Sequence, residues 1–182
     1  MRIDKLHRTY DIDVNLIHFP LHPDTPAEGM TLEQLFAGRG GDAASRKARQ
    51  ERMKGLMRDE GLPYGERTHT YNSRLAQELG KWADTQANSA AIHDAIYRAY
   101  FVDGKNIGDV DVLVALAASV GLDATEARRV LETRSFKEAI DADWQLAGRS
   151  GVTGVPTFAA GGYGVVGAQP YETIAELLEN AG

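Results

Sequence analysis

The chain of 182 residues contains no cysteine. It therefore has no disulfide framework, and it carries no thiol that could serve as a redox centre, a nucleophile or a metal ligand. Long apolar runs are also missing, because no stretch approaches the roughly 20 residues that a membrane-spanning helix needs. The first residues are not followed by the apolar segment of a secretory signal, so we expect a cytoplasmic protein without a membrane partner.

Positive charge is in short supply as well. The formal net charge is −6, which argues against nucleic acid as a main partner. What the chain does have is enough apolar material for a core, since 43% of its residues are hydrophobic. This length and composition predict one domain, or one domain that carries a large insertion.

Helical periodicity extends over most of residues 31–150. Asp109 and Asp123 stand where they can cap helices, and Gly121 ends the apolar helix between them. The links between the predicted helices are short, which favours antiparallel neighbours. The sequence therefore predicts a compact, all-helical insertion subdomain over residues 31–150.

The two ends of the chain differ from this middle part. Residues 2–10 have the spacing of the last turns of a helix, and the alternation over 12–19 predicts a strand inside a covered sheet. Near the other end, residues 157–166 predict a hairpin that turns at two glycines, and a last helix follows Pro170. We therefore expect residues 1–30 and 151–182 to form an α/β domain around the insertion.

The segment Gly151-Val-Thr-Gly-Val-Pro-Thr-Phe158 leads directly into this hairpin. A proline before a strand can end a helix-to-strand loop with an ordinary trans bond, and it can also form a cis bond in a specially shaped loop. In the cis form, the N–H and C=O of Val155 point outward. They can then pair with an extended peptide or with the backbone of a small thiol, which is recognition by strand addition.

Several motifs occur in the order found in one known family: Phe19-Pro-Leu-His-Pro-Asp-Thr-Pro26, Tyr100-Phe-Val-Asp-Gly-Lys-Asn-Ile107, the loop 151–158 and Gly167-Ala-Gln-Pro170. In this combination the chain resembles the DsbA-type thioredoxin-fold oxidoreductases, and the FrnE-like branch in particular. The 2-hydroxychromene-2-carboxylate isomerases and the kappa-class glutathione transferases are relatives of that branch. The resemblance implies an α/β, thioredoxin-like fold with a helical insertion, in which Val155-Pro156 is the cis-proline loop.

The chain departs from the family at its beginning. Members start with a strand and an active-site motif, C-x-x-C or a serine, ahead of the first helix, whereas this chain starts within that helix. The first strand and the catalytic motif are thus absent from these residues, and we assign no catalytic residue. A start site placed too far downstream, a truncation, and a variant that takes a strand from a partner would each explain this pattern.

The resemblance implies thiol–disulfide exchange as the family activity, with this chain inactive by itself because it has no cysteine. It places substrate at Thr153, Gly154, Val155, Pro156 and Gln169. It implies no metal and no bound cofactor, with glutathione as a candidate substrate or cosubstrate. Expected partners are an extended peptide or a small thiol or disulfide, and a homodimer is an open alternative. Two other functions stay open: a glutathione-dependent isomerase or transferase, and a degenerate, non-catalytic module that binds a strand or peptide.

Two histidines, His18 and His22, are four residues apart. On a strand followed by a proline-rich loop, this spacing does not converge on a metal ion. We therefore expect packed or solvated histidines at both positions, although the resemblance puts this segment near the mouth of the family's active site.

Overall fold

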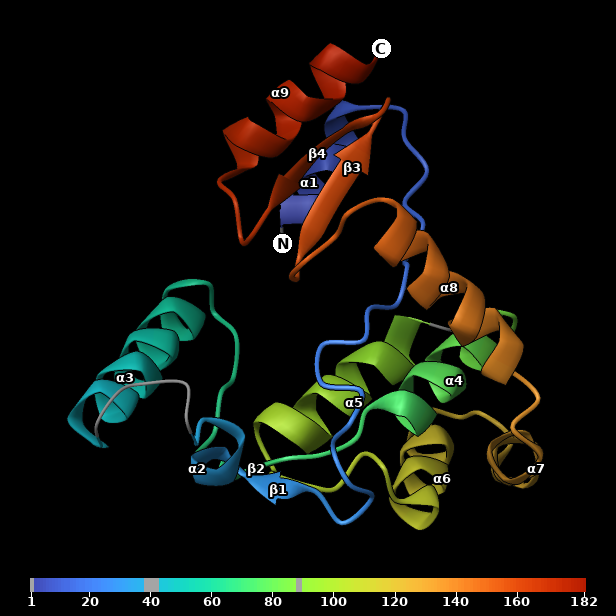
Figure 1. Cartoon of the computed structure of the whole chain (residues 1–182). Coiled ribbons are helices and arrows are strands. Elements are labelled where there is room, and N and C mark those ends of the chain that lie inside the picture. The colour runs from blue at the N-terminus through green and yellow to red at the C-terminus, as the bar shows by residue number, and fades with distance from the viewer. Residues whose placement is uncertain (1, 38–42, 88–89) are drawn as a thin grey trace. The chain divides into compact units, whose positions relative to one another are not determined.

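The computed structural model describes residues 2–37, 43–87 and 90–182 (Figure 1). The chain divides into two compact units. Unit 1 combines Met1–Leu21 with Asp141–Gly182, and unit 2 is His22–Ile140. The domain boundaries expected after residue 30 and before residue 151 stay a prediction.

The regular structure in the described residues of unit 2 consists of helices and one short ladder. The strands β1 (Met30–Thr31) and β2 (His69–Thr70) pair antiparallel, with Met30 opposite Thr70. Two-residue strands leave no periodicity in the sequence, and this ladder was not predicted. The helices that begin within unit 2 are α2 (Leu32–Leu35), α3 (Ala43–Asp59), α4 (Arg74–Ala83), α5 (Ala90–Phe101), α6 (Val110–Ser119), α7 (Ala124–Thr133) and α8 (Lys137–Arg149), of which α8 continues into unit 1.

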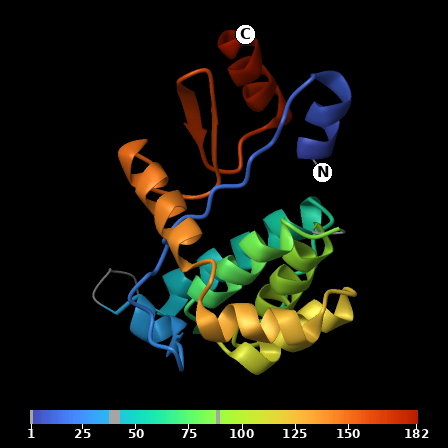
Figure 2. The ribbon, with the colours of Figure 1, turned by 90° about the vertical axis from the view of Figure 1, so that its right-hand side faces the viewer.

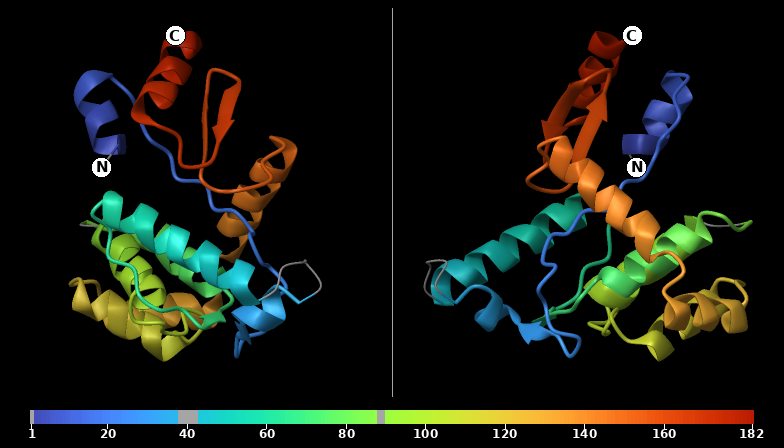
Figure 3. Two further views of the ribbon diagram at one scale, coloured as in Figure 1. Left: turned by 90° about the vertical axis from the view of Figure 1, so that its left-hand side faces the viewer. Right: turned by 45° about the vertical axis from the view of Figure 1, so that its right-hand side comes forward.

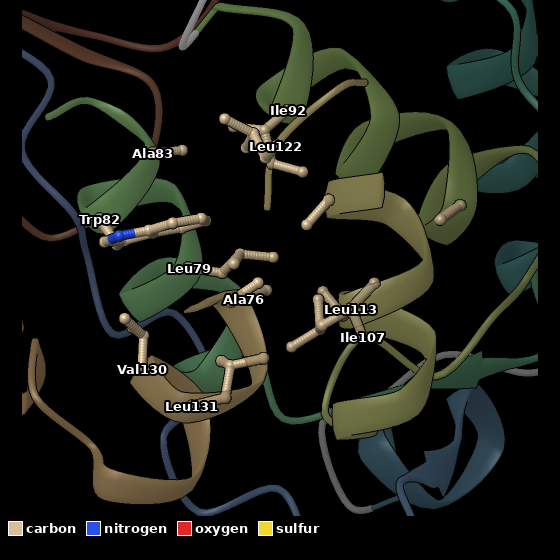
Figure 4. Packing of buried hydrophobic residues seen from close by; sticks show 13 residues of the cluster. Ala76, Leu79, Trp82, Ala83, Ile92, Ile107, Leu113, Leu122, Val130 and Leu131 are labelled. Carbon is tan, nitrogen blue, oxygen red and sulfur yellow. The ribbon is translucent and has the colours of Figure 1, made fainter. Parts of the chain in front are cut away.

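The core of unit 2 lies among helices α4 to α7. Figure 4 shows its side chains pointing toward one another from these helices and from the loops between them. Leu79 of α4, Ile92 of α5 and Leu113 of α6 are fully buried. Burial of each such side chain contributes about 1.5–3 kcal/mol relative to exposure. This cluster also includes Ala76, Trp82, Ala83, Ala99, Ile107, Ala117, Leu122, Ala127, Val130 and Leu131.

One carboxylate is buried beside this core. Glu78 of α4 is fully buried, and its side chain accepts hydrogen bonds from two arginines. Arg74 Nε lies 2.7 Å from Oε1, while Arg134 Nε and Nη2 lie 2.8 and 2.7 Å from Oε2 and Oε1. Burial by itself would raise the pKa of the Glu78 carboxyl, but the hydrogen bonds from Arg134 and Arg74 outweigh it, and the pKa is lowered. The carboxylate thus ties α4 to the residue that follows α7.

The predicted N-caps of α6 and α7 are confirmed. Asp109 Oδ1 accepts hydrogen bonds from the backbone N–H groups of Asp111 and Val112, at 2.8 and 3.1 Å. Asp123 accepts from Thr125 and Glu126 in the same manner. These bonds satisfy N–H groups that have no partner inside the helix.

Loss of the first cap has a measurable cost. We expect Asp109→Ala to lower the free energy of unfolding by about 1 kcal/mol, because the two N–H groups lose their acceptor. Asp109→Asn keeps an oxygen at the same place and should recover most of this loss. Urea unfolding followed by circular dichroism measures both variants, and equal destabilisation by alanine and asparagine would contradict the capping role.

Unit 1 contains a hairpin and two helices besides its part of α8. The strands β3 (Thr157–Ala160) and β4 (Tyr163–Val166) pair antiparallel, with Thr157 opposite Val166, which confirms the predicted hairpin. Helix α9 (Tyr171–Ala181) packs against both strands (Figure 2). Helix α1 (Arg2–Thr9) contributes Leu6 to a small core with Ile174 and Ala175 of α9.

The strand predicted over Ile12–Phe19 is wrong. Residues 11–20 form no helix or strand, and Figure 3 shows them as an extended trace that follows α1. The alternating sequence satisfies one requirement of a strand, but a strand also needs a neighbour for its backbone, and the only partner of β3 among the described residues is β4. Val14, Leu16 and Ile17 are consequently exposed.

The far end of this extended segment is anchored to α8. The backbone N–H of His18 lies 3.2 Å from Asp143 Oδ2, and its ring nitrogen Nδ1 lies 2.9 Å from the same oxygen. Both side chains are largely buried. His18 is therefore a packed histidine, as expected, and its partner is a carboxylate 125 residues away in the sequence.

Candidate functional site

The predicted substrate-binding residues gather at the open end of the β3–β4 hairpin. The loop 153–156 enters β3, and residues 167–169 leave β4 directly beside it. The N–H of Gly167 donates a 2.7 Å hydrogen bond to the carbonyl of Pro156, which joins the two segments. A Cβ placed on Gly154 would lie 3.9 Å from Cγ1 of Val166, so a small side chain at position 154 would reach the residue that ends β4.

Val155 differs from both of its neighbours in its hydrogen bonding. The carbonyl of Gly154 accepts a 2.7 Å hydrogen bond from Thr157 Oγ1, and the carbonyl of Pro156 accepts the bond from Gly167. No residue in the described part of the chain hydrogen-bonds the N–H or the C=O of Val155. The residue is 50% exposed, and the bond between Val155 and Pro156 is cis, the conformation that the resemblance implies. One peptide donor and one acceptor are thus available to a ligand.

Gln169 lies on the other side of the same loop end. Its Nε2 donates a 2.6 Å hydrogen bond to the carbonyl of Val166, and its backbone N–H donates to Gly167 at 2.8 Å. Its side chain is half-buried, whereas Thr153 is exposed. The structure therefore places Gly154, Val155 and Pro156 on one side of the loop end and Gln169 on the other, joined through Gly167, and Thr153 is exposed.

The proline-rich segment after His22 belongs to unit 2 and is held there by two asparagines. Nδ2 of Asn72 donates to the carbonyls of Pro23 and Thr25, at 3.3 and 2.7 Å. Nδ2 of Asn106 donates to the carbonyl of Ala27 at 3.1 Å. Sequence reasoning did not identify these contacts. The Oδ1 atom of each asparagine accepts a hydrogen bond from the N–H group two residues later. The sequence can indicate such a local turn, but not a bond to a segment 47 or 79 residues away.

The described residues contain no group of three or more histidine, aspartate and glutamate side chains placed to hold a metal ion. Within the same ranges, none of the helices combines the length and the apolar character that crossing a membrane requires.

Three features together define a thioredoxin-like protein with an insertion. They are an antiparallel hairpin covered by α9, a cis proline where the preceding loop enters β3, and a helical unit inserted ahead of that loop. Residues 1–179 match the family model of the DSBA-like thioredoxin domain. The chain belongs to this family.

Individual relatives agree with this assignment. A probable DsbA oxidoreductase of Streptomyces coelicolor, SCO1869, is 31% identical and superimposes with a TM-score of 0.88 over 99% of this chain and 81% of its own. A 2-hydroxychromene-2-carboxylate isomerase shares the fold with a TM-score of 0.68, at 20% identity over 98% of this chain and 84% of its own. Both likenesses extend over units 1 and 2, so the helical insertion is part of the shared fold.

YwbO of Bacillus subtilis (strain 168), a protein of uncharacterized function, is 36% identical over 116 residues, or 62% of this chain. The chain spans 56% of the length of this curated relative.

Proposed function

We propose that this chain forms the substrate-binding part of a DsbA/FrnE-like thiol–disulfide exchange protein, and that the backbone of Val155 binds an extended peptide or a small thiol such as glutathione. The observation that carries the proposal is the hydrogen bonding of the loop. The carbonyls on both sides of Val155 are used internally, while its own N–H and C=O have no partner among the described residues. Such a pair of groups suits strand addition.

The family and the Streptomyces coelicolor relative support exchange as the reaction of the complete site. In exchange, a thiolate attacks one sulfur of a substrate disulfide, a mixed disulfide forms, and the other sulfur leaves as a thiolate. This chain supplies no sulfur nucleophile. Its residues would hold the substrate backbone beside the reacting sulfur, with Gln169 and Gly167 bordering the same place.

Binding at Val155 is tested by adding glutathione disulfide, or an unstructured carboxymethylated peptide, to the ¹⁵N-labelled chain. We expect saturable shifts of the Val155 amide resonance and of its neighbours in residues 153–157. Val155→Ala keeps the backbone N–H and should bind within about threefold of the unmodified chain. Val155→Gly is the matched control for the side chain, because it keeps the backbone groups and removes the whole exposed side chain. Absence of shifts at millimolar ligand, or shifts confined to unit 2, would contradict the proposal.

The exchange reaction needs a separate measurement. The 182-residue chain is expected to catalyse insulin reduction by dithiothreitol no faster than buffer, because it contains no thiol. Saturable binding of glutathione without any binding of the peptide would favour a glutathione-dependent isomerase or transferase. Binding of the peptide alone would favour a non-catalytic peptide-binding module.

A further inference from the structure

Helix α3 of unit 2 is basic, although the chain as a whole is acidic (Figure 1). It holds six of the 20 lysines and arginines of the chain but only two of the 26 aspartates and glutamates. Gln50, Lys54 and Met57 are half-buried, and Met57 Sδ lies 3.9 Å from the hydroxyl oxygen of Tyr97 in α5. These residues mark the side of α3 that faces the rest of unit 2.

An exposed face of the same helix combines arginine with apolar residues. Arg49, Arg52, Met53 and Leu56 stand at the i, i+3, i+4 and i+7 positions, which places them on one face of an α-helix. All four are exposed, Met53 by 41% and Leu56 by 51%. The guanidinium of Arg49 lies 5.7 Å from the centre of the Phe36 ring, so an aromatic residue borders them. We call the four helical residues the α3 face.

The two arginines of the α3 face carry charge that no neighbouring carboxylate neutralises. Neither has an ion-pair partner in the part of the chain that the structure describes. Lys54 and Arg58, on other sides of the helix, do have partners: Lys54 Nζ lies 3.1 Å from Glu66, and Arg58 Nε lies 3.6 Å from Asp59. A helix face that meets only water is usually polar, with pairs of opposite charge. The α3 face instead presents like charges beside apolar side chains.

We propose that the α3 face binds an acidic segment of another protein, in which carboxylates stand beside aliphatic side chains. This inference goes beyond the proposed function and uses no residue of the Val155 loop. The planar guanidinium groups of Arg49 and Arg52 can each form two parallel hydrogen bonds with a carboxylate. Met53 and Leu56 add apolar contact, and methionine and arginine are both enriched at protein–protein interfaces.

Charge favours a short acidic segment over an extended polyanion. Nucleic acids and anionic membranes attract proteins through many charges at once, and the net charge of −6 opposes that attraction. A short segment on α3 is governed by charges within about one Debye length, roughly 8–10 Å, because salt screens the more distant ones. Arg49 and Arg52 are about one helical turn apart, so the partner is expected to carry two carboxylates at that spacing.

Binding is measured by the fluorescence anisotropy of a labelled peptide of about 15 residues that combines glutamate and leucine at helical spacing. We expect saturable binding at low salt, and weaker binding as added salt screens the charges. The same peptide with lysine in place of glutamate should not bind. The peptide with serine in place of leucine should bind at least about tenfold more weakly, because it buries no apolar side chain against Met53 and Leu56.

Two double variants locate the site. Arg49→Gln with Arg52→Gln should weaken binding at least about tenfold, because both charge-assisted contacts are lost. Lys54→Gln with Arg58→Gln is the matched control, since it removes the same charge from other sides of α3, and it should bind within about twofold of the unmodified chain.

Several results would overturn the proposal: no binding of the glutamate–leucine peptide, equal binding of the serine peptide, or equal weakening by the two double variants. Phosphatidylserine vesicles and duplex DNA are the comparison ligands. Binding of either one without binding of the peptide would also overturn it.

Discussion

Replacing Glu78 with alanine is expected to lower the free energy of unfolding by about 3 kcal/mol. Removal of one partner from a buried ion pair typically costs about 3–5 kcal/mol, because the remaining charge loses its compensation. Here Arg74 and Arg134 both lose the carboxylate that they share. We expect the lower end of that range because the side chain of Arg134 is 41% exposed and can be solvated in the variant.

Helix α7 offers a matched control for this variant. Glu126 of α7 pairs with Arg129, but the Glu126 side chain is 41% exposed, so Glu126→Ala should change the free energy of unfolding far less than Glu78→Ala does. Urea denaturation of both variants at pH 7 measures the difference. Similar, small changes for the two variants would show that the buried carboxylate contributes no more than a surface pair.

A second variant, Glu78→Gln, tests the direction in which the pKa of Glu78 is shifted. The pKa of Glu78 is lowered in the folded chain, so the stabilisation by its carboxylate is fully present above the unfolded pKa of about 4.3. It is lost as the pH falls through the lowered pKa. The difference in stability between the unmodified chain and Glu78→Gln should therefore shrink on acidification below about pH 4. A difference that stays constant down to pH 3 would contradict the ionised state of this group.

The second large effect is expected in the core of unit 2. Leu113 is fully buried among α4 to α7, and Leu113→Ala should cost about 2–5 kcal/mol through lost burial and the cavity that remains. Leu56 of α3 is 51% exposed, and Leu56→Ala makes the same chemical change without a cavity. We expect that control to stay within about 0.5 kcal/mol of the unmodified chain. Thermal unfolding followed at 222 nm compares the two, and equal losses would place the core elsewhere.

Local signals explain which parts of the fold were predictable. Asp109 and Asp123 were recognised as caps because a cap and its helix lie within three residues of each other in the sequence. The hairpin was recognised because its turn, Gly161-Gly162, separates two short apolar runs. The prediction of a strand over Ile12–Phe19 was wrong because the alternating pattern indicates the composition of a strand and does not indicate whether a neighbouring strand is present.

Long-range partners explain what could not be predicted. In the sequence, nothing distinguishes Glu78 from an exposed glutamate of a helix, because its ionic partner Arg134 is 56 residues away. His18 was expected to be packed, but nothing near it in the sequence indicates Asp143 as its partner. At the candidate site, the composition of the loop 151–158 and the motif after β4 indicated which residues to consider. The contrast between Val155 and its two neighbours depends on Thr157, which is local, and on Gly167, which only the folded hairpin brings to the loop.

The bonds from His18 to Asp143 have a consequence for the modularity of the protein. The chain leaves unit 1 after Leu21 and returns to it at Asp141, so both crossing points lie within three residues of this hydrogen-bonded pair. An inserted unit whose ends are held this close can be exchanged for a short linker with little change in the distance that the linker must span. His18 and Asp143 therefore mark the graft points at which residues 22–140 can be removed or replaced by a different insertion.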